Sequence, residues 1–322
     1  MTRVRTGLTA AACVLGVVAA AQQPVFRGSG DVVRVFSTVT DRGGKLVTTL
    51  VRDSFEVRDE GKPQPITQFD NTPQPVRLIV MLDVSGSMEG NLQLLREAAD
   101  ELFIRLRPDD VARVGSFGFD VDVGRGFTHE IRELRAALPR SIAPDAPTPL
   151  WRAVDEAITA FGDEKDMRSV VLVLSDGKDT GGWRTFGSDP LERVISRAQS
   201  EDVMVYSIGL RGSVPVLTRV GGLPSTTSSK TTWRADSDPD PGLSTLAIDS
   251  GGRYFELQAQ DDLSATFARV ADELHRQYEI GYRVPSLDGK VHTIEVRVTR
   301  PGLTVRARRG YLAPKGTNGK EK

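Results

Sequence analysis

The chain has 322 residues, of which 39% are hydrophobic and 26% are charged, an ordinary composition for a globular protein with a buried core. Lys and Arg total 42 against 43 Asp and Glu, so the formal charge of -1 provides no global attraction for nucleic acid or an anionic membrane. One cysteine and three histidines exclude a disulfide framework and a Cys-rich zinc site, so any bound metal should have oxygen ligands.

The N-terminal residues have the pattern of a secretory signal peptide. Arg3 and Arg5 precede an apolar run over residues 8–20, and the small residues at its end form a cleavage site for signal peptidase. We therefore predict a signal peptide over residues 1–21 and an exported mature chain, which is periplasmic, displayed on the cell surface or secreted. The alternatives are a retained membrane anchor, for which the run is short, and a lipoprotein processed at Cys13.

Residues 24–75 have the short alternating apolar pattern of antiparallel strands. The turn-forming sequences at residues 41–44 and 59–62 separate the apolar segments. Four prolines then interrupt the pattern between residues 63 and 75, as in a connection and not in a central strand. The sequence therefore predicts a small N-terminal β segment.

From residue 76 the pattern alternates between apolar strands and amphipathic helices. The apolar runs at residues 76–82, 170–174 and 203–210 lack polar alternation, as expected for strands buried on both faces of a parallel sheet. Helically spaced apolar residues lie between these runs. We therefore predict a doubly wound, Rossmann-like α/β domain over residues 76–278, with a mostly parallel central sheet and its functional site at the carboxyl ends of the strands.

Two further segments depart from this alternation. Residues 212–242 are rich in Ser, Thr, Gly, Pro and Asp and predict a long surface loop or insertion. Residues 279–313 return to a strand-like alternation, and residues 314–322 predict a disordered tail. Because the N- and C-terminal β segments each have few strands and would expose their edges, we expect them to pair into one small β-sandwich into which the α/β domain is inserted.

Polar side chains follow two of the buried strands. Asp83, Ser85 and Ser87 come directly after the first strand, Asp176 follows the strand at residues 170–174, and Thr148 lies between them in the sequence. Two carboxylates and three hydroxyls form an all-oxygen set, which suits Mg²⁺ or Mn²⁺. With only two formally charged ligands, such an ion would still attract an outside carboxylate. The alternative is that the serines cap a helix and the aspartate closes a turn.

These residues carry a resemblance to a known family. The segment LIVMLDVSGSM (residues 78–88) resembles the first strand and the metal-ion-dependent adhesion site (MIDAS) of von Willebrand factor type A (VWA) domains, whose pattern is D-x-S-x-S. The segment VVLVLSDG (residues 170–177) is similar to the strand that carries the later aspartate of that site, and the loop at Thr148 is similar to the loop that carries its threonine. The resemblance extends over about residues 75–278.

The resemblance implies a role for each matching residue. Ser85, Ser87 and Thr148 would contact the metal directly or nearly so, whereas Asp83 and Asp176 would act partly through water. One departure concerns the threonine loop, which commonly reads Gly-Gly-Thr in the family but reads Ala-Pro-Thr here. The implied cofactor is Mg²⁺, with Mn²⁺ or Ca²⁺ as substitutes.

The two flanking β segments also resemble known sequences. DRGGKLVTTL and FEVRDEGKPQPITQF on the N-terminal side, with RQYEIGYRVP and HTIEVRVTRPGLTVRARRGYLAP on the C-terminal side, look like the flanks of a group of exported bacterial proteins, frequent in acidobacteria. In that group a VWA domain lies between the two flanks.

The resemblance implies an exported, metal-dependent protein-binding module of the adhesion type. Its partner would be a protein with an exposed acidic residue, with no role for nucleic acid and no membrane span after signal cleavage. Trp183 and Met88 are candidate residues of the ligand rim. One alternative is a structural component of an envelope complex, in which the metal only stabilises the fold.

An enzyme is not expected from this sequence. It contains no G-x-S-x-G motif, its three histidines are far apart, and no thiol remains after processing. A metal-dependent hydrolase is the remaining catalytic alternative.

Overall fold

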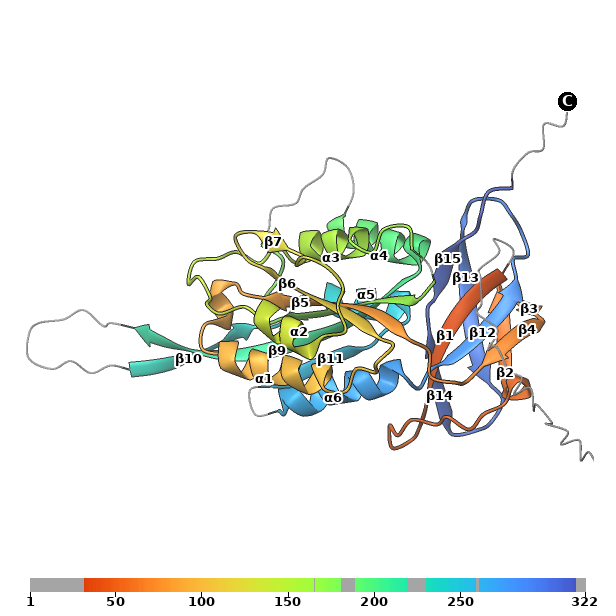
Figure 1. Cartoon of the computed structure of the whole chain (residues 1–322), viewed down its shortest axis with the longest axis horizontal. Coiled ribbons are helices and arrows are strands. Elements are labelled where there is room, and N and C mark those ends of the chain that lie inside the picture. The colour runs from red at the N-terminus through yellow and green to blue at the C-terminus, as the bar shows by residue number, and fades with distance from the viewer. Residues whose placement is uncertain (1–31, 165, 181–188, 219–229, 259–260, 317–322) are drawn as a thin grey trace, which may run out of the picture.

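The computed structural model describes residues 32–316 except 165, 181–188, 219–229 and 259–260, and it describes the side chains of these residues outside 212–237. The predicted signal peptide therefore lies outside the described residues, as does Trp183. Within the described residues, no helix is both long and apolar enough to cross a membrane. The described chain forms an α/β domain and a β-sandwich that lie end to end (Figure 1).

The α/β domain is built on a sheet of strand order β10-β9-β8-β5-β6-β7, in which β11 pairs with β9. Its strands are β5 (Val76–Asp83), β6 (Val111–Phe117), β7 (Val121–Asp122), β8 (Arg168–Ser175), β9 (Val203–Thr218), β10 (Lys230–Ser237) and β11 (Tyr254–Gln258). The ladders of β5 with β6 and β8, and of β9 with β8 and β11, are parallel. Every residue of β5 and of β8 is buried, which explains why their apolar residues do not alternate with polar ones.

Helices cover both faces of this sheet. The helices are α1 (Leu92–Phe103), α2 (Ile131–Ala137), α3 (Leu150–Thr159), α4 (Pro190–Glu201), α5 (Gly242–Ser250) and α6 (Leu263–Leu274), with short 3-10 turns η1 (Arg52–Ser54) and η2 (Gly86–Met88). One hydrophobic cluster joins α1, α2 and α6 to the sheet, and a second joins α3, α4 and α5 to its other face. Figure 1 shows α3 and α4 on one side of the sheet and α1 and α6 on the other. The predicted doubly wound α/β domain is therefore confirmed.

The terminal segments form two antiparallel sheets, of order β14-β1-β12-β4 and β15-β13-β2-β3. Their strands are β1 (Val32–Asp41), β2 (Phe55–Asp59), β3 (Lys62–Gln64), β4 (Ile66–Asp70), β12 (Tyr278–Arg283), β13 (Val291–Val298), β14 (Leu303–Ala307) and β15 (Gly310–Leu312). Strand β1 lies between β12 and β14, and β2 pairs with β13, so each sheet combines N- and C-terminal strands around a shared apolar core. The predicted β-sandwich, into whose sequence the α/β domain is inserted, is thus confirmed.

The two units join where the chain passes between them. Strand β5 begins at Val76, as predicted, but α6 ends at Leu274, and Tyr278 is already the first residue of β12, paired with Ser37. The predicted tail is ordered at its start, because Lys315 bridges to Asp288 in the turn between β12 and β13.

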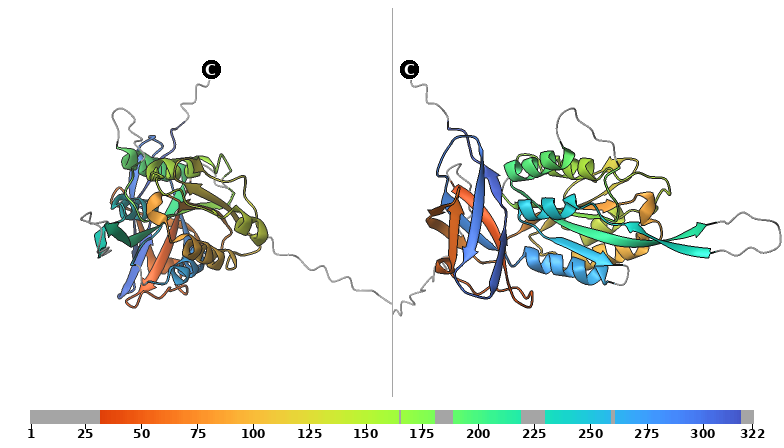
Figure 2. Two further views of the ribbon diagram at one scale, coloured as in Figure 1. Left: turned by 90° about the vertical axis from the view of Figure 1, so that its left-hand side faces the viewer. Right: turned by 180° about the vertical axis from the view of Figure 1, so that it is seen from behind.

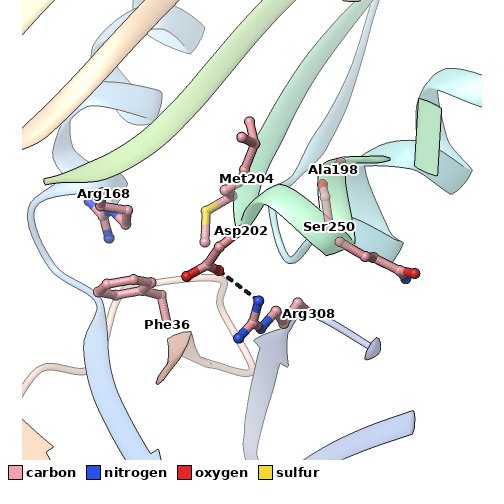
Figure 3. A pocket seen from close by; sticks show the side chains of 9 residues that line it. Phe36, Arg168, Ala198, Asp202, Met204, Ser250 and Arg308 are labelled. Carbon is pink, nitrogen blue, oxygen red and sulfur yellow. Dashed lines mark hydrogen bonds and ion pairs between the residues drawn. The ribbon is translucent and has the colours of Figure 1, made fainter. Parts of the chain in front are cut away.

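A polar seam connects the base of the α/β domain to the sandwich. Glu273, which is fully buried, accepts a hydrogen bond from the hydroxyl of Tyr206 at 2.8 Å and pairs with Arg253 and with Arg306 of β14. Figure 3 shows a small cavity nearby, where Asp202 and Arg308 point toward each other and form an ion pair of 2.6 Å. These contacts link the two units through charged side chains that are buried or partly buried.

The segment at residues 212–242 differs from the predicted surface loop. Strand β9 continues to Thr218 and pairs with β10 in an antiparallel ribbon, and α5 begins at Gly242. Figures 1 and 2 show this ribbon projecting from the end of the α/β domain opposite the sandwich. The composition suggested a loop, but backbone hydrogen bonds between two strands do not depend on apolar side chains.

Candidate functional site

The polar residues after β5 and β8 meet at one edge of the sheet. The two strands are parallel neighbours, with Leu82 opposite Leu174, so the aspartates that end β5 and follow β8 lie side by side. Asp83 and Asp176 have exposed fractions of 0% and 1%. Burial of two carboxylates at a sheet edge is costly unless both are hydrogen-bonded or bind a cation.

Hydrogen bonds connect four of the five predicted site residues into one network. Ser87 Oγ donates to Asp176 Oδ1 at 2.6 Å and lies 3.0 Å from Ser85 Oγ. Asp83 Oδ1 accepts the backbone N–H of Ser85 at 2.8 Å, and its Oδ2 accepts from Ser175. Ser175 was not among the predicted site residues. Its position at the end of a buried strand, directly before the aspartate, is the signal that could have found it.

Thr148 reaches the same edge through a loop held against the first one. The N–H of Gly86 donates to Ala146 O at 3.1 Å, and a Cβ at residue 86 would lie 1.7 Å from Pro144 O, so only glycine fits there. A Cβ built on Gly177 would lie 3.2 Å from Thr148 Oγ1 and 3.8 Å from Ser87 Oγ. Both hydroxyls therefore flank the segment that follows Asp176.

A second hydrogen-bonded pair fixes the threonine loop. Thr180 Oγ1 accepts the N–H of Thr148 at 2.8 Å, and the N–H of Thr180 donates to Thr148 O at 2.9 Å. Asp179 Oδ1 accepts the N–H of Trp151 at 3.3 Å at the start of α3. Sequence reasoning missed Thr180 and Asp179, although both lie within four residues of Asp176.

The surroundings of this edge disfavour the charged form of its two carboxyl groups. Burial raises the pKa of Asp83 to about 6, although hydrogen bonds from Ser175 and Ser85 oppose the shift, and Asp176 adds repulsion. Burial also raises the pKa of Asp176, against the hydrogen bond from Ser87. Among the described residues, Asp176 Oδ2 is buried and has no hydrogen-bond partner. A carboxylate oxygen in that position is suited to contact a cation.

The donor set fits a hard cation only if hydroxyls take part. Within the part of the chain that the structure describes, no group of three or more His, Cys, Asp and Glu side chains is arranged to hold a metal. The edge instead offers two carboxylates with three hydroxyls, all oxygen donors of the kind that Mg²⁺ accepts together with water. The residues are therefore compatible with such an ion.

The predicted ligand rim needs a correction. Met88 is fully buried in the core beside α1, because η2 directs its side chain inward, so its prediction as a rim residue is wrong. A different apolar residue is exposed near the site, namely Phe119, at 62%. The neighbouring Gly118 lies against both site loops, since a Cβ there would be 3.2 Å from Val84 and 3.4 Å from Ala146. The signal for Phe119 was an aromatic residue just beyond the carboxyl end of β6.

Comparison with known families agrees with this geometry. The von Willebrand factor type A domain model matches residues 78–269, which include β5, β8 and the loops that carry the predicted site residues. The chain belongs to this family. No curated protein matches the VWA chain in sequence.

Several solved structures are similar to the VWA chain. An aerotolerance-related membrane protein from Bacteroides fragilis has 14% identity and a TM-score of 0.45, over 62% of this chain and 98% of that chain. The conserved hypothetical protein BatB from Bacteroides thetaiotaomicron has 16% identity and a TM-score of 0.45, over 62% of this chain and 98% of that chain. A von Willebrand factor type A protein from Catenulispora acidiphila has 12% identity and a TM-score of 0.48, over 92% of this chain and 79% of that chain.

Proposed function

We propose that this VWA protein is an exported module that binds a partner protein through a divalent cation, Mg²⁺ or a substitute such as Mn²⁺ or Ca²⁺. The cation would be held by the oxygen donors of the metal edge, Asp83, Ser85, Ser87, Thr148 and Asp176. The observation that carries the proposal is the buried oxygen Asp176 Oδ2, which has no donor among the described residues and lies beside the serine hydroxyls.

The chain's own residues prepare the edge for an acidic ligand. Asp83 holds the serine loop through the N–H of Ser85 and the hydroxyl of Ser175, and Gly86 allows the threonine loop to approach. When bound, the cation would supply an electrophile for an outside carboxylate. Because three of the donors are uncharged hydroxyls, the two aspartates only balance the ion's charge, and an acidic side chain of the partner remains attractive.

We also infer that the protein is not an enzyme. His275 contacts Asp110, and His292 contacts Asp59, Asp288 and Tyr311, so neither ring is paired with a serine or threonine hydroxyl. His129 is exposed beside Glu130. A nucleophile needs an adjacent base within hydrogen-bond reach, and these contacts provide none.

Metal binding is tested by titrating Mg²⁺ into the purified chain and into Asp83→Ala, with calorimetry as the readout. We expect saturable binding by the wild type and none by the variant, with circular dichroism unchanged. Asp145→Ala is the matched control, because Asp145 is an exposed carboxylate in the threonine loop. Binding that persists in Asp83→Ala, or that Asp145→Ala removes, would exclude this metal site.

The partner-binding step needs a separate test. Proteins of the native envelope are captured on the wild-type chain, with and without EDTA, and on Asp83→Ala. We expect one protein that the wild type captures only without EDTA and that Asp83→Ala does not capture. Its capture by the wild type should return when excess Mg²⁺ is added after EDTA. Equal capture under all conditions would show that the metal does not bridge the two proteins.

A structural role in an envelope assembly is the second candidate. It is favoured by three exposed large hydrophobic residues of the sandwich, Leu287, Val291 and Leu312, of which the last two are paired across β13 and β15. In this role the sandwich would make the contacts. Capture would then be insensitive to EDTA and would be lost in Leu312→Ser, which separates the two candidates.

A further inference from the structure

A buried polar cluster joins the two sheets of the sandwich, far from the metal edge. Asp59, at the end of β2, is 1% exposed. Its Oδ2 accepts hydrogen bonds from the hydroxyls of Tyr282 at 2.9 Å and Tyr311 at 2.8 Å, and its Oδ1 lies 2.8 Å from Nδ1 of His292. Tyr282 belongs to β12 in one sheet, whereas the other three residues belong to the opposite sheet.

The second nitrogen of His292 contacts another carboxylate. Nε2 lies 3.3 Å from Oδ1 of Asp288, which also accepts the N–H of Lys290 at 2.9 Å. Carboxylates only accept hydrogen bonds, so both contacts are satisfied together only when both ring nitrogens carry a proton. The geometry is therefore that of an imidazolium ring held between two carboxylates.

Other titratable and charged groups surround the ring. Glu60, Lys62 and Lys290 line a cavity of about 360 Å³ next to it, and the guanidinium of Arg308 lies 6.0 Å from the ring of Tyr311. Burial, and then Asp59, raises the pKa of Tyr282 and of Tyr311, so both tyrosines remain hydrogen-bond donors to Asp59 at neutral pH. Histidine is the side chain whose ordinary pKa lies near neutrality, and His292 is the histidine of this cluster.

The balance on His292 favours its charged form. Burial alone lowers the pKa of a histidine, but hydrogen bonds and charge interactions with Asp59 and Asp288 outweigh burial and raise the pKa of His292. The stability that the charged ring contributes is fully present below the ordinary pKa of about 6.5 and is lost as the pH rises through the raised value.

We propose that His292 is a proton-operated latch that holds the turn of residues 284–290 against the end of the sandwich. In the neutral ring, the proton on Nδ1 keeps the short contact with Asp59, and the lone pair of Nε2 then faces Asp288. The turn then loses the hydrogen bond between Asp288 and the ring, and only its start stays packed on the core, through Val284. Because the turn also binds the last described residues, through Asp288 opposite Lys315 and through Leu287 O to the N–H of Gly316, its release also frees that segment.

The latch does not involve the residues of the metal edge, so a test can reject the latch without rejecting metal binding, and the reverse. The direct measurement is a pH titration of the three histidine side chains by NMR on the full chain. We expect the pKa of His292 to lie above the ordinary histidine value of about 6.5. A pKa of His292 at or below that value would overturn the proposal.

Hydrogen exchange tests the mechanical consequence. Between pH 6 and 9, after correction for intrinsic rates, we expect protection to fall in residues 285–291 and 313–316 but not in β5. The melting temperature should also decrease between pH 6 and pH 9, because the charged ring no longer contributes to stability. Equal protection at both pH values would contradict the latch.

Two variants separate a latch from a merely structural contact. His292→Gln should have low protection in the turn at pH 6 already, with no further loss at pH 9. Asp288→Asn should keep the turn closed at pH 9, because its amide can donate to the neutral ring. His129→Gln is the control and should behave as the wild type. If His292→Gln fails to fold, the test rests on Asp288→Asn. If Asp288→Asn lost as much protection in the turn between pH 6 and 9 as the wild type does, the latch would be overturned.

Discussion

The metal edge of the α/β domain and the interior of the sandwich both bury a carboxylate at 1% exposure, but the two carboxylates are satisfied differently. Asp59 has three donors, two tyrosine hydroxyls and an imidazole ring. Asp176 has one donor on Oδ1 and none on Oδ2 among the described residues. The difference separates a carboxylate that the fold itself neutralises from one that is left available for a ligand.

The same contrast applies to the cost of removing each side chain. Without Asp59, two tyrosine hydroxyls and a charged ring remain buried without their common acceptor. Without Asp176, the metal-free edge loses a carboxylate that has one hydrogen-bond donor and whose pKa burial already raises, so the fold should lose less stability. Stability measurements in EDTA therefore distinguish the two regions directly.

The largest expected effect is that of Asp59→Ala. Breaking a buried charge pair by removing one partner costs about 3–5 kcal/mol, and we expect a loss of this size in the free energy of unfolding. Urea unfolding followed by far-ultraviolet circular dichroism would measure it. The matched variant Asp176→Ala, in EDTA, should cost less, because Asp176 has one donor and one oxygen without a partner among the described residues. Equal losses in the two variants would remove the distinction between a satisfied and an available carboxylate.

Mg²⁺ should produce the next largest effect, and only at the metal edge. A ligand at 100 times its dissociation constant stabilises the folded state by about 2.7 kcal/mol if it binds the folded chain alone. We expect this gain for the wild type and for His292→Gln, but not for Ser87→Ala, which lacks one of the hydroxyl donors. Thermal unfolding with and without Mg²⁺ checks it, and a gain that persists in Ser87→Ala would place the ion elsewhere.

Much of the fold follows from the sequence because burial on both sheet faces leaves a distinctive pattern. The apolar runs of β5 and β8 predicted central parallel strands, and the few strands of each flank predicted their pairing. The ribbon of β9 and β10 could not be predicted in this way. Its backbone hydrogen bonds pair a Ser-, Thr- and Gly-rich segment whose composition is typical of loops.

The metal edge was accessible from the sequence because its residues lie in short motifs at strand ends. Asp83, Ser85 and Ser87 fall within five residues, and Asp176 directly follows β8. The cluster at Asp59 and His292 was not accessible, because 233 residues separate the two and the resemblance of the flanking segments does not show which of their residues are in contact. The buried position of Met88 was also missed, since periodicity does not determine the direction of a side chain in a single 3-10 turn.

Stability in EDTA should also depend on pH at the α/β site. Because burial raises the pKa of Asp83 to about 6, the folded state binds a proton more tightly than the unfolded chain. The free energy of unfolding should therefore decrease as the pH rises from about 4 to about 6, the window between the ordinary and the raised pKa. Asp83→Asn should flatten this part of the profile, measured by urea unfolding at each pH.

Saturating Mg²⁺ provides the control for that profile. The ion binds the ionised carboxylates, so it should oppose the loss of stability between pH 4 and 6 in the wild type. It should have no such effect in Asp83→Asn. The contribution of His292 appears at higher pH, where its raised pKa lies, so the two regions can be separated in one titration. If neither saturating Mg²⁺ nor the substitution Asp83→Asn altered the pH profile between pH 4 and 6, the electrostatic description of the edge would be wrong.

The smallest expected effect concerns the exposed aromatic residue beside the metal edge. Phe119→Ala should leave the free energy of unfolding within about 0.5 kcal/mol, because the side chain is 62% exposed, and should leave Mg²⁺ affinity unchanged. If the partner docks across this edge, an exposed aromatic ring next to the metal contributes about 1 kcal/mol, roughly fivefold in affinity. Val51→Ala is the matched control, since Val51 is 63% exposed on the sandwich side of the chain. A weakened complex with Val51→Ala and an unaffected one with Phe119→Ala would move the docking surface from the metal edge to the sandwich.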